Sequence, residues 1–473
     1  MIRFSINTLG CKVNLCESDD ISGELAGSGL EMVGYGDDPD FCIINTCTVT
    51  AESDKKARQL IRKIKNVSKG SKIIVTGCFV GSNKKFLEDA GIDYIIDNSR
   101  KDSIPKLIAG LIEEDEHAGS WPEYTPEADL PHKAEYTSKA DNPPNSISRH
   151  SRPLVKIQDG CEQNCTYCIV PGVRGRYKSM GLAGIIRKIG NIEESGYEEV
   201  VLTGIHIGKY GVNTGKAQIM EGDPAASDLA QLITEILDRT MIKRIRISSL
   251  EINEISEGLL EVIKNNSGRI APHLHIPLQS GSDKILGSMG RPYDRDHFIR
   301  KIEEVRKVLP RAAITTDIIA GFPGETPGDF EETVLLAKKI DFSKLHVFKY
   351  SPRPGTIASN IMGQVDFCQK SGRSKKLREL GDSMREDFLN NNLGRELLVI
   401  CERKEKEKRT VSGTSGEYIK VYFRTERDFK KIHGKLVRVI TVKKYQDGLW
   451  ADEIAKIESK HKKHKYFTGS TDK

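Results

Sequence analysis

Residues 154–168 of this chain read LVKIQDGCEQNCTYC, a strand-like stretch followed at once by three closely spaced cysteines. The stretch LVKIQDG predicts a β-strand, and the cysteines occupy the loop after it. Three thiolates packed this tightly can each bind one iron of a cubic [4Fe–4S] cluster. Structural zinc usually has four ligands, and the sequence offers no fourth cysteine or histidine nearby. We therefore expect an iron–sulfur cluster on Cys161, Cys165 and Cys168, with zinc or redox-active thiols as the alternatives.

Such a cluster leaves its fourth iron without a protein ligand. An amino-acid chelate, such as the methionine end of S-adenosylmethionine, can bind to that iron. An electron from the cluster can then break the sulfonium carbon–sulfur bond and release a carbon radical. The cysteine loop therefore indicates a reaction that begins with a radical made by the cofactors.

The cysteine loop opens a region in which strands and helices alternate. Residues 149–378 contain six apolar segments that read as β-strands, and helical segments separate them. A complete eight-stranded βα barrel needs about 250 residues, which is more than this region offers. We predict an incomplete, parallel (β/α)6 barrel. Its strand segments are LVKIQDG, EEVVLTGIH, RIRISSLE, PHLHIPLQS, AAITTDIIAGF and KLHVFKYS.

Residues 1–113 also alternate between strand and helix, which predicts a doubly wound parallel sheet. Cys11, Cys47 and Cys78 each stand where a strand ends, in NTLGC, IINTC and IVTGC. Because the carboxyl ends of parallel strands lie along one edge of a sheet, we expect these thiols to converge. We interpret them as ligands of a second [4Fe–4S] cluster with one open iron. Three unrelated buried cysteines and a zinc site are the alternatives.

These motifs together resemble a known family. The CxxxCxxC loop after the first strand of a βα barrel is similar to that of the radical-SAM superfamily. LGCKVN, NTCTVT, VTGC and IQDGCEQNCTYCIVPGVRGR resemble the motifs of its methylthiotransferase family, over nearly the whole chain. GCKVN and KIQDGC look most like the branch that modifies N6-threonylcarbamoyladenosine beside the tRNA anticodon. Leu15-Cys16 and Gly172-Val173 depart from the Gln-Tyr and Tyr-Ala that are more usual in that branch.

The resemblance implies a reaction, its partners and a set of site residues. The Cys161, Cys165 and Cys168 cluster would reduce S-adenosylmethionine, and the resulting 5′-deoxyadenosyl radical would take the C2 hydrogen of the modified adenosine. Sulfur carried by the second cluster would then join C2, and another S-adenosylmethionine would methylate it. The implied partners are a tRNA anticodon stem-loop, an electron donor and a sulfur source. The residues that resemble the S-adenosylmethionine site are Thr203, Gly204, Ser249, Glu251, Gln279, Ser280 and Asp317.

The C-terminal region differs from the rest in charge and in pattern. From Cys401 to Lys473 there are 20 Lys or Arg residues against 11 Asp or Glu, although the whole chain has a net charge of only +6. Short alternating strands within 379–457 predict a small β-barrel, which resembles the RNA-binding TRAM domain. A basic surface of this kind suits a polyanion, and a solvated lysine-rich face is the alternative. The candidate RNA contacts are Lys420, Arg424, Lys431, Lys435, Lys443 and Lys444.

The remaining features limit the class of protein. Residues 114–148 are rich in proline and charge and predict a linker, and 458–473 form a basic tail. Neither a signal peptide nor a membrane span is evident, so we expect a cytoplasmic protein, taken to be a monomer. The rival functions are methylthiolation of isopentenyladenosine in tRNA or of a ribosomal-protein aspartate, and an iron–sulfur RNA-binding sensor. No role is assigned to Cys16, Cys42, Cys368 or Cys401.

Overall fold

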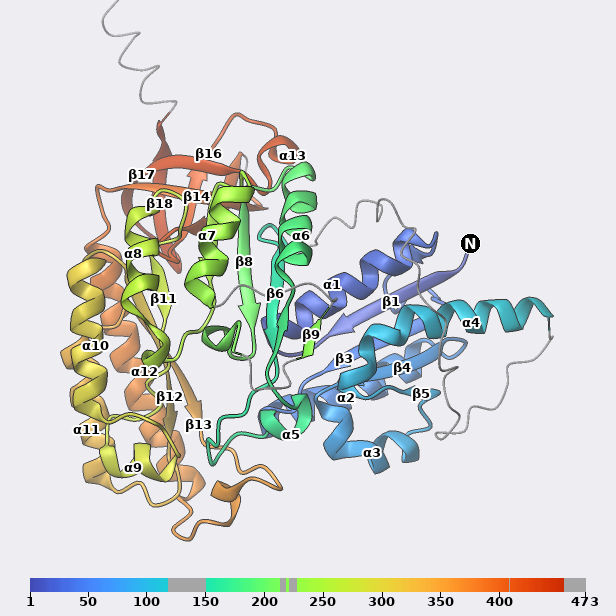
Figure 1. Cartoon of the computed structure of the whole chain (residues 1–473), viewed down its shortest axis with the longest axis horizontal. Helices are drawn as coiled ribbons and strands as arrows, with labels where there is room; N and C mark the ends of the chain where they lie inside the picture. Colours follow the sequence, from blue (N-terminus) through green and yellow to red (C-terminus); the bar gives the residue numbers. More distant parts are fainter. Residues whose placement is uncertain (118–149, 213–217, 221–227, 408, 455–473) are drawn as a thin grey trace, which may run out of the picture. The chain divides into compact units, whose positions relative to one another are not determined.

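The computed structural model of the protein divides into two compact units (Figure 1). It describes residues 1–117, 150–212, 218–220, 228–407 and 409–454. Within the described residues, the first unit is made of 1–117, 159–177 and 351–359, and the second of 150–158, 178–212, 218–220, 228–350, 360–407 and 409–454. The predicted basic tail, and the predicted linker apart from residues 114–117, lie outside the described residues.

The first unit is built on the predicted parallel sheet, whose five strands have the order β2-β1-β3-β4-β5. Within its central strand β3, Ile43 packs with helices α1 and α4, whereas Cys42 and Ile44 pack with helices α2 and α3. This alternation places helices on both faces of the sheet, which is the doubly wound arrangement. The strands are β1 Arg3–Thr8, β2 Glu31–Met32, β3 Phe41–Thr46, β4 Lys72–Gly77 and β5 Tyr94–Ile95. The helices are α1 Lys12–Gly27, α2 Ala51–Val67, α3 Phe79–Asp89 and α4 Ile104–His117.

The second unit contains the predicted incomplete barrel of six parallel strands. Strands β6, β8 and β10 are neighbours in one sheet, and β11, β12 and β13 are neighbours in another. Isolated bridges from Ile245 to Ile270 and from Ser249 to His275 connect the two sheets. The strands are β6 Leu154–Asp159, β8 Glu199–Gly204, β10 Arg244–Ile247, β11 His273–His275, β12 Ala313–Ala320 and β13 Lys344–Lys349, with β7 Lys178–Met180 and β9 Gln218–Met220 at one edge.

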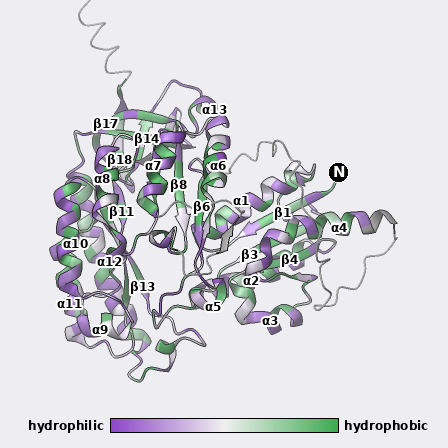
Figure 2. Cartoon of the chain, in the orientation of Figure 1, coloured by the Kyte–Doolittle hydropathy of each residue, from purple (hydrophilic) through white to green (hydrophobic). Residues whose placement is uncertain are grey.

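The helices of the second unit bury an apolar stripe against these strands. Val155 and Ile157 of β6 belong to one large apolar cluster together with Ile185 of α6 and Leu232 of α7. Figure 2 shows both polar and apolar residues along these helices, as expected for helices with one buried face. Within the described ranges, every helix is too short or too polar for a membrane span. The helices are α6 Leu182–Glu194, α7 Leu229–Arg239, α8 Glu257–Asn265, α9 Asp283–Ser288, α10 Arg295–Val308, α11 Pro327–Ile340 and α12 Phe367–Asn390.

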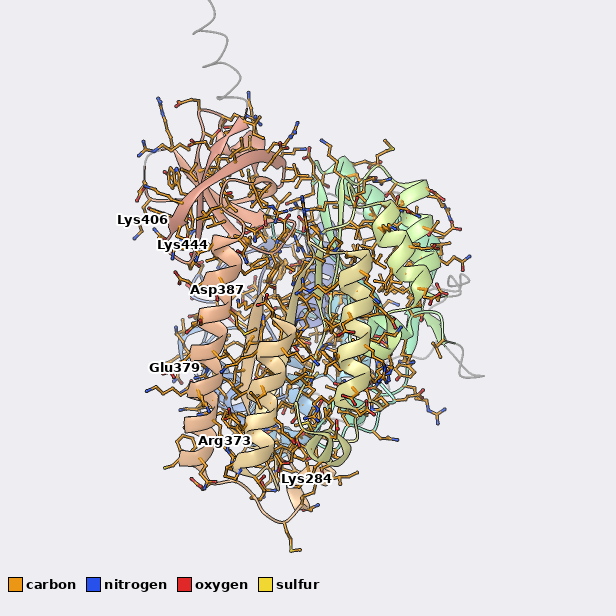
Figure 3. All side chains as sticks on the ribbon, turned by 90° about the vertical axis from the view of Figure 1, so that its left-hand side faces the viewer. Lys284, Arg373, Glu379, Asp387, Lys406 and Lys444 are labelled. Carbon is orange, nitrogen blue, oxygen red and sulfur yellow. The ribbon has the colours of Figure 1, made fainter. Side chains whose placement is uncertain are left out.

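The C-terminal residues form the predicted small β-barrel, closed in the order β14-β15-β16-β18-β17. Helix α12 leads into it, and Figure 3 shows Glu379 and Asp387 along this helix. The predicted domain limit between 378 and 379 falls inside α12, and the domain limits stay a prediction. The strands are β14 Glu396–Lys404, β15 Thr410–Ser415, β16 Lys420–Arg424, β17 Leu436–Tyr445 and β18 Gly448–Glu453, with the short helix α13 Phe429–Ile432.

Candidate active site

The three N-terminal cysteines stand at neighbouring strand ends. Cys11 lies between β1 and α1, Cys47 directly follows β3, and Cys78 directly follows β4. Because β1, β3 and β4 are adjacent and parallel, the three cysteines share one edge of the sheet. Cys47 and Cys78 are buried, whereas Cys11 is exposed. Burial raises the pKa of both buried thiols, and the nearby Cys11 thiol raises both pKa values further.

Glycines directly before two of the cysteines let the chain approach this edge closely. Gly10 has a φ of 123°, and a Cβ there would lie 2.8 Å from the Cβ of Cys47. Gly77 has a φ of 99°, and a Cβ there would collide with the carbonyl oxygen of Thr46. Only glycine suits both the backbone conformation and the space at these positions. The strand-end loops therefore lie against each other.

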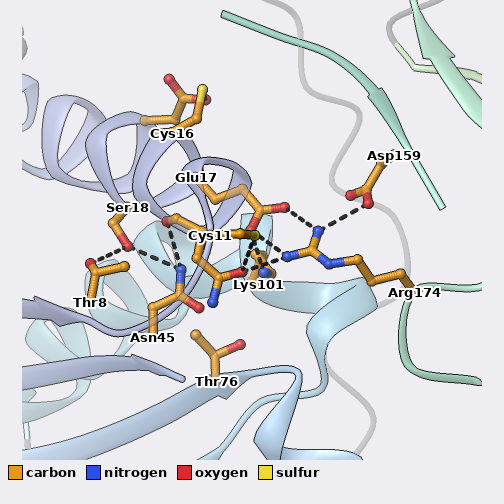
Figure 4. A network of polar contacts seen from close by, with 12 residues as sticks. Thr8, Cys11, Cys16, Glu17, Ser18, Asn45, Thr76, Lys101, Asp159 and Arg174 are labelled. Carbon is orange, nitrogen blue, oxygen red and sulfur yellow. Dashed lines mark hydrogen bonds and ion pairs between the residues drawn. The ribbon is translucent and has the colours of Figure 1, made fainter. Parts of the chain in front are cut away.

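A buried network of charges, which the sequence did not indicate, lies beside Cys11 (Figure 4). At its centre is Arg174, the last residue of α5 (Val170–Arg174), whose side chain is 1% exposed. Its guanidinium donates to Glu17 Oε1 at 3.1 Å and to Asp159 Oδ1 at 2.9 Å. Lys101 Nζ donates to Glu17 Oε2 at 2.5 Å. Two cations thus share two carboxylates inside the first unit.

The same network reaches the thiols. The charges of Arg174 and Lys101 both oppose the rise that burial causes in the pKa of the Cys78 thiol. Arg174 also opposes the rise in the pKa of Cys47. A cation beside a thiol favours the thiolate, which is the form that binds metal. The network is therefore placed to stabilise bound thiolates in an otherwise buried site.

Asn14 ties the start of α1 to two strand ends. Its Nδ2 donates to the main-chain oxygens of Leu9 and Thr46, both at 2.9 Å. Its Oδ1 accepts a hydrogen bond from Arg174 at 2.5 Å. Asn45 donates in turn to the main-chain oxygen of Asn14 at 3.0 Å. These bonds join the charge network to the loops that carry the first two cysteines.

Cys161, Cys165 and Cys168 lie half-buried in the loop after β6. The main-chain N–H of Cys161 donates to the oxygen of Gly175 at 2.9 Å, and that of Cys168 donates to the oxygen of Cys165 at 3.0 Å. Gly160 has a φ of 73°, and a Cβ there would collide with the main chain that returns beside it. The loop is therefore folded back on itself. Both cysteine triads belong to the first unit.

The donor atoms suit iron–sulfur clusters. Each triad offers three thiols, which is the ligand set of a [4Fe–4S] cluster with one open iron. In the described part of the chain, no three His, Cys, Asp or Glu side chains are already arranged to hold a metal ion. The two ligand sets therefore stay predictions. The cations beside Cys78 and the glycines beside both triads fit a bulky, thiolate-bound group.

The predicted S-adenosylmethionine residues lie on β8, on β12 and in the loops after β10 and β11. The main-chain N–H of Gln279 donates to the oxygen of Asp317 at 2.8 Å, and Gln279 has a φ of 67°. Glu251 is ion-paired with Arg291, and burial raises the pKa of its carboxyl group. The structure brings Gln279 and Asp317 together, and the role of the whole set stays a prediction. The other members are Thr203, Gly204, Ser249 and Ser280.

The candidate RNA contacts lie on the C-terminal β-barrel and differ in their surroundings. Lys420, Lys435 and Lys444 each pair with a carboxylate of the same unit, so their charges are partly neutralised. Lys431 and Lys443 are exposed. The set comes from β16 (Lys420 and Arg424), α13 (Lys431), the loop after α13 (Lys435) and β17 (Lys443 and Lys444).

Comparison with known proteins places this architecture in a family. The radical SAM superfamily matches residues 155–337, and uncharacterized protein family UPF0004 matches residues 3–97. The chain is 34% identical over 448 residues to threonylcarbamoyladenosine tRNA methylthiotransferase MtaB of Bacillus subtilis, with 94% of each chain covered. The chain belongs to the methylthiotransferase family of radical-SAM proteins. Family membership implies a [4Fe–4S] cluster and S-adenosylmethionine as cofactors.

Other methylthiotransferases show similar levels of identity. The MtaB protein of Thermotoga maritima is 34% identical over 398 residues, covering 84% of this chain and 86% of that protein. A tRNA-2-methylthio-N(6)-dimethylallyladenosine synthase of Corynebacterium jeikeium is 32% identical over 451 residues, covering 92% and 84%. Among solved structures, the radical S-adenosylmethionine methyltransferase TsrM of Kitasatospora setae has a TM-score of 0.52 at 14% identity, covering 76% of this chain and 77% of that chain. That structure supports the fold.

Proposed function

We propose that this member of the methylthiotransferase family converts N6-threonylcarbamoyladenosine beside the tRNA anticodon to its 2-methylthio derivative. The observation that carries the reaction is the presence of two cysteine triads in one compact unit. Attaching sulfur to an unactivated carbon requires both a means of breaking a C–H bond and a source of sulfur. The choice of nucleoside is supported by the GCKVN and KIQDGC motifs and by the named activities of the Bacillus and Thermotoga relatives.

Cys161, Cys165 and Cys168 would hold the cluster that binds S-adenosylmethionine, and the triad that begins with Cys11 would hold a second cluster. When bound, these groups supply the electron that cleaves S-adenosylmethionine and the sulfur that is joined to C2. The protein positions these groups, places charges beside them and excludes water. Arg174 and Lys101 favour the thiolate form of the buried thiols, and Asn14 and the two glycines hold the loops of the first triad together.

Burial of the first triad serves the proposed reaction. Cys47 is 6% exposed and Cys78 is 5% exposed, so water has little access to a group bound there. Exclusion of water protects a radical or sulfur intermediate from side reactions. Cys11 is the exposed member of the triad, which leaves one side of the site open to a substrate.

The C-terminal β-barrel is the proposed contact for the anticodon stem-loop. An anticodon loop presents unstacked bases, which are the parts of RNA that proteins read specifically. Exposed Lys431 and Lys443 would contact phosphates, and such contacts weaken as salt rises. An electron donor and a sulfur source are required in addition.

Anaerobic assays of the reconstituted protein test this proposal. Anticodon stem-loops that carry either threonylcarbamoyladenosine or isopentenyladenosine are offered, and 5′-deoxyadenosine and methylthio nucleosides are measured by mass spectrometry. Cys165→Ala is expected to abolish both products. Cys47→Ala is expected to retain 5′-deoxyadenosine and to lose the methylthio product. Cys368→Ala, at an exposed cysteine without an assigned role, is the matched control.

Each outcome of these assays distinguishes the rivals. A product from the isopentenyladenosine RNA alone would leave the chemistry intact and replace the proposed substrate by that of the Corynebacterium relative. Formation of neither product by the wild-type protein with full clusters would favour an iron–sulfur sensor. A methylthio product made by Cys47→Ala would contradict the assignment of the second triad.

A further inference from the structure

The turn between β15 and β16 of the C-terminal β-barrel has an unusual backbone. Tyr418 has a φ of 65°, a left-handed conformation that residues with large side chains rarely adopt. Its N–H donates to the oxygen of Ser415 at 3.1 Å, and the N–H of Ser415 donates to the oxygen of Ile419 at 2.8 Å. Such a conformation persists where the surrounding structure holds it in place. The contacts of this turn are therefore informative.

The ring of Tyr418 packs against side chains from β10, from β11 and from the residues just before β6. It stacks on His273 of β11, with ring centroids 4.7 Å apart and planes 16° from parallel. The guanidinium of Arg246, on β10, lies 5.3 Å from the ring centroid, and that of Arg152 lies 5.6 Å from it. A ring between an imidazole and two guanidinium groups gains both stacking and cation–π energy. Tyr418 thus connects the C-terminal β-barrel to side chains of β10 and β11.

The main chain of the turn is held as firmly as the ring. Arg244 and Arg246 are both buried, and both pair with Glu199, which is fully buried. A Cβ on Gly416 would lie 2.9 Å from Cδ of Pro272, so the turn lies directly against the start of β11. With its charge balanced, each arginine can donate its remaining N–H groups to neutral oxygens. At 2.6–3.2 Å they donate to the main-chain oxygens of Leu398, Thr414, Ser415 and Gly416.

A chain of polar side chains runs from this turn along the βα barrel. His273 Nε2 lies 3.0 Å from Thr315 Oγ1, which lies 2.9 Å from His275 Nδ1. His275 Nε2 lies 3.3 Å from Asp317 Oδ2. His273 and His275 are two residues apart on β11, as are Thr315 and Asp317 on β12, so each pair faces the same side of its strand. This row of polar side chains therefore connects the C-terminal β-barrel to Asp317, which is predicted to bind S-adenosylmethionine.

We propose that Tyr418 is a positioning residue, which fixes His273 and, through Thr315 and His275, the carboxylate of Asp317. The C-terminal β-barrel then has a role beyond RNA binding, because its turn sets the geometry inside the βα barrel. This inference rests on the proposed function only in assigning Asp317 to the S-adenosylmethionine site. The link from Tyr418 to His275 holds whichever nucleoside is the substrate.

The first experiment measures the link without any reaction. Histidine-labelled holoenzyme is compared by NMR as wild type, Tyr418→Ala and Tyr418→Phe. Tyr445→Ala is the matched control, because Tyr445 is a tyrosine of the same β-barrel whose ring packs against Tyr422 and Trp450. Tyr418→Ala is expected to shift the imidazole signals of both His273 and His275, although only His273 touches the ring. Tyr418→Phe, which keeps the ring, is expected to give the imidazole signals of the wild type. Unchanged His275 signals in Tyr418→Ala would overturn the proposal.

The second experiment measures the consequence for S-adenosylmethionine. Formation of 5′-deoxyadenosine is followed without RNA, and binding of a stem-loop RNA is measured separately. Tyr418→Ala is expected to raise KM for S-adenosylmethionine about tenfold, the usual effect of losing one hydrogen bond to a charged group. The RNA affinity of Tyr418→Ala is expected to match that of the wild type. Tyr418→Phe is expected to have the KM of the wild type. An unchanged KM alongside shifted His275 signals would contradict the assignment of Asp317 to the S-adenosylmethionine site. A loss of RNA binding alone would reduce the turn to an RNA contact and overturn the proposal.

Discussion

Replacement of Arg174 by glutamine is expected to loosen the edge of the first unit that carries Cys11, Cys47 and Cys78. Glutamine keeps a hydrogen-bonding group but removes the charge and the fork of N–H donors. Glu17 then keeps its ion pair with Lys101 but loses the one with Arg174, and Asp159 also loses its ion pair with Arg174. The change therefore removes a buried cation that two carboxylates share.

The size of the effect follows from burial. The side chain of Arg174 is 1% exposed, that of Glu17 is 2% exposed and that of Asp159 is 15% exposed. Removing one partner of a buried ion pair typically costs about 3–5 kcal/mol. We expect the lower end, about 3 kcal/mol, because Lys101 still neutralises Glu17 and water still reaches Asp159. Arg176→Gln is the control. Its side chain is 77% exposed and its contact with Glu162 is 3.6 Å long, so about 0–1 kcal/mol is expected.

Hydrogen exchange measured by mass spectrometry is the assay, because it reports the opening free energy of each segment separately. Peptides from α1 and from β3 are compared among the wild type, Arg174→Gln and Arg176→Gln. The account predicts a loss of about 3 kcal/mol at α1 in Arg174→Gln alone. Equal protection of α1 in all three proteins would refute the reasoning, since the network would then contribute nothing to this edge.

Three further changes test other parts of the account. Gly77→Ala is expected to cost about 1–3 kcal/mol in urea unfolding, from its φ of 99° and the collision with Thr46; Gly70→Ala, with open space around it, is the control. Burial raises the pKa of Asp329, but hydrogen bonds from Lys284, Thr326 and Ser282 outweigh it and hold the pKa well below its usual range. The ionised form of Asp329 therefore stabilises the fold above about pH 4 and does so less below that pH. The difference in melting temperature between wild type and Asp329→Asn is expected to shrink as pH falls below about 4. Lys443→Ala is expected to weaken RNA binding and to lower the slope of log affinity against log salt by roughly one, as measured by fluorescence anisotropy.

The sequence was most informative where one residue type marks a strand end. Cys11, Cys47 and Cys78 were expected at one sheet edge, and the structure places them at the ends of β1, β3 and β4. The six barrel strands and the C-terminal β-barrel were also predicted, because apolar periodicity reports which segments are buried. Apolar periodicity does not show which polar side chains pair with one another. Arg174 and Glu17 are far apart in the sequence, and nothing in either segment identifies the other.

Local pattern is a weak guide where a polar face is buried. Helix α1, which spans Lys12–Gly27, is an example. Asn14 and Glu17 are buried near its start because they face the charge network, so the apolar spacing of an amphipathic helix is missing there. Three of the four unassigned cysteines are fully buried, as free cysteines often are: Cys16, Cys42 and Cys401.

The central claim is that this protein makes a methylthio group on threonylcarbamoyladenosine in tRNA. Mass spectrometry of tRNA nucleosides, from cells lacking the gene and from cells in which it is restored, tests it most directly. The account predicts that 2-methylthio-N6-threonylcarbamoyladenosine disappears without the gene, returns with the wild-type gene and stays absent when only Cys47→Ala is supplied. An unchanged level of this nucleoside in cells lacking the gene would contradict the account.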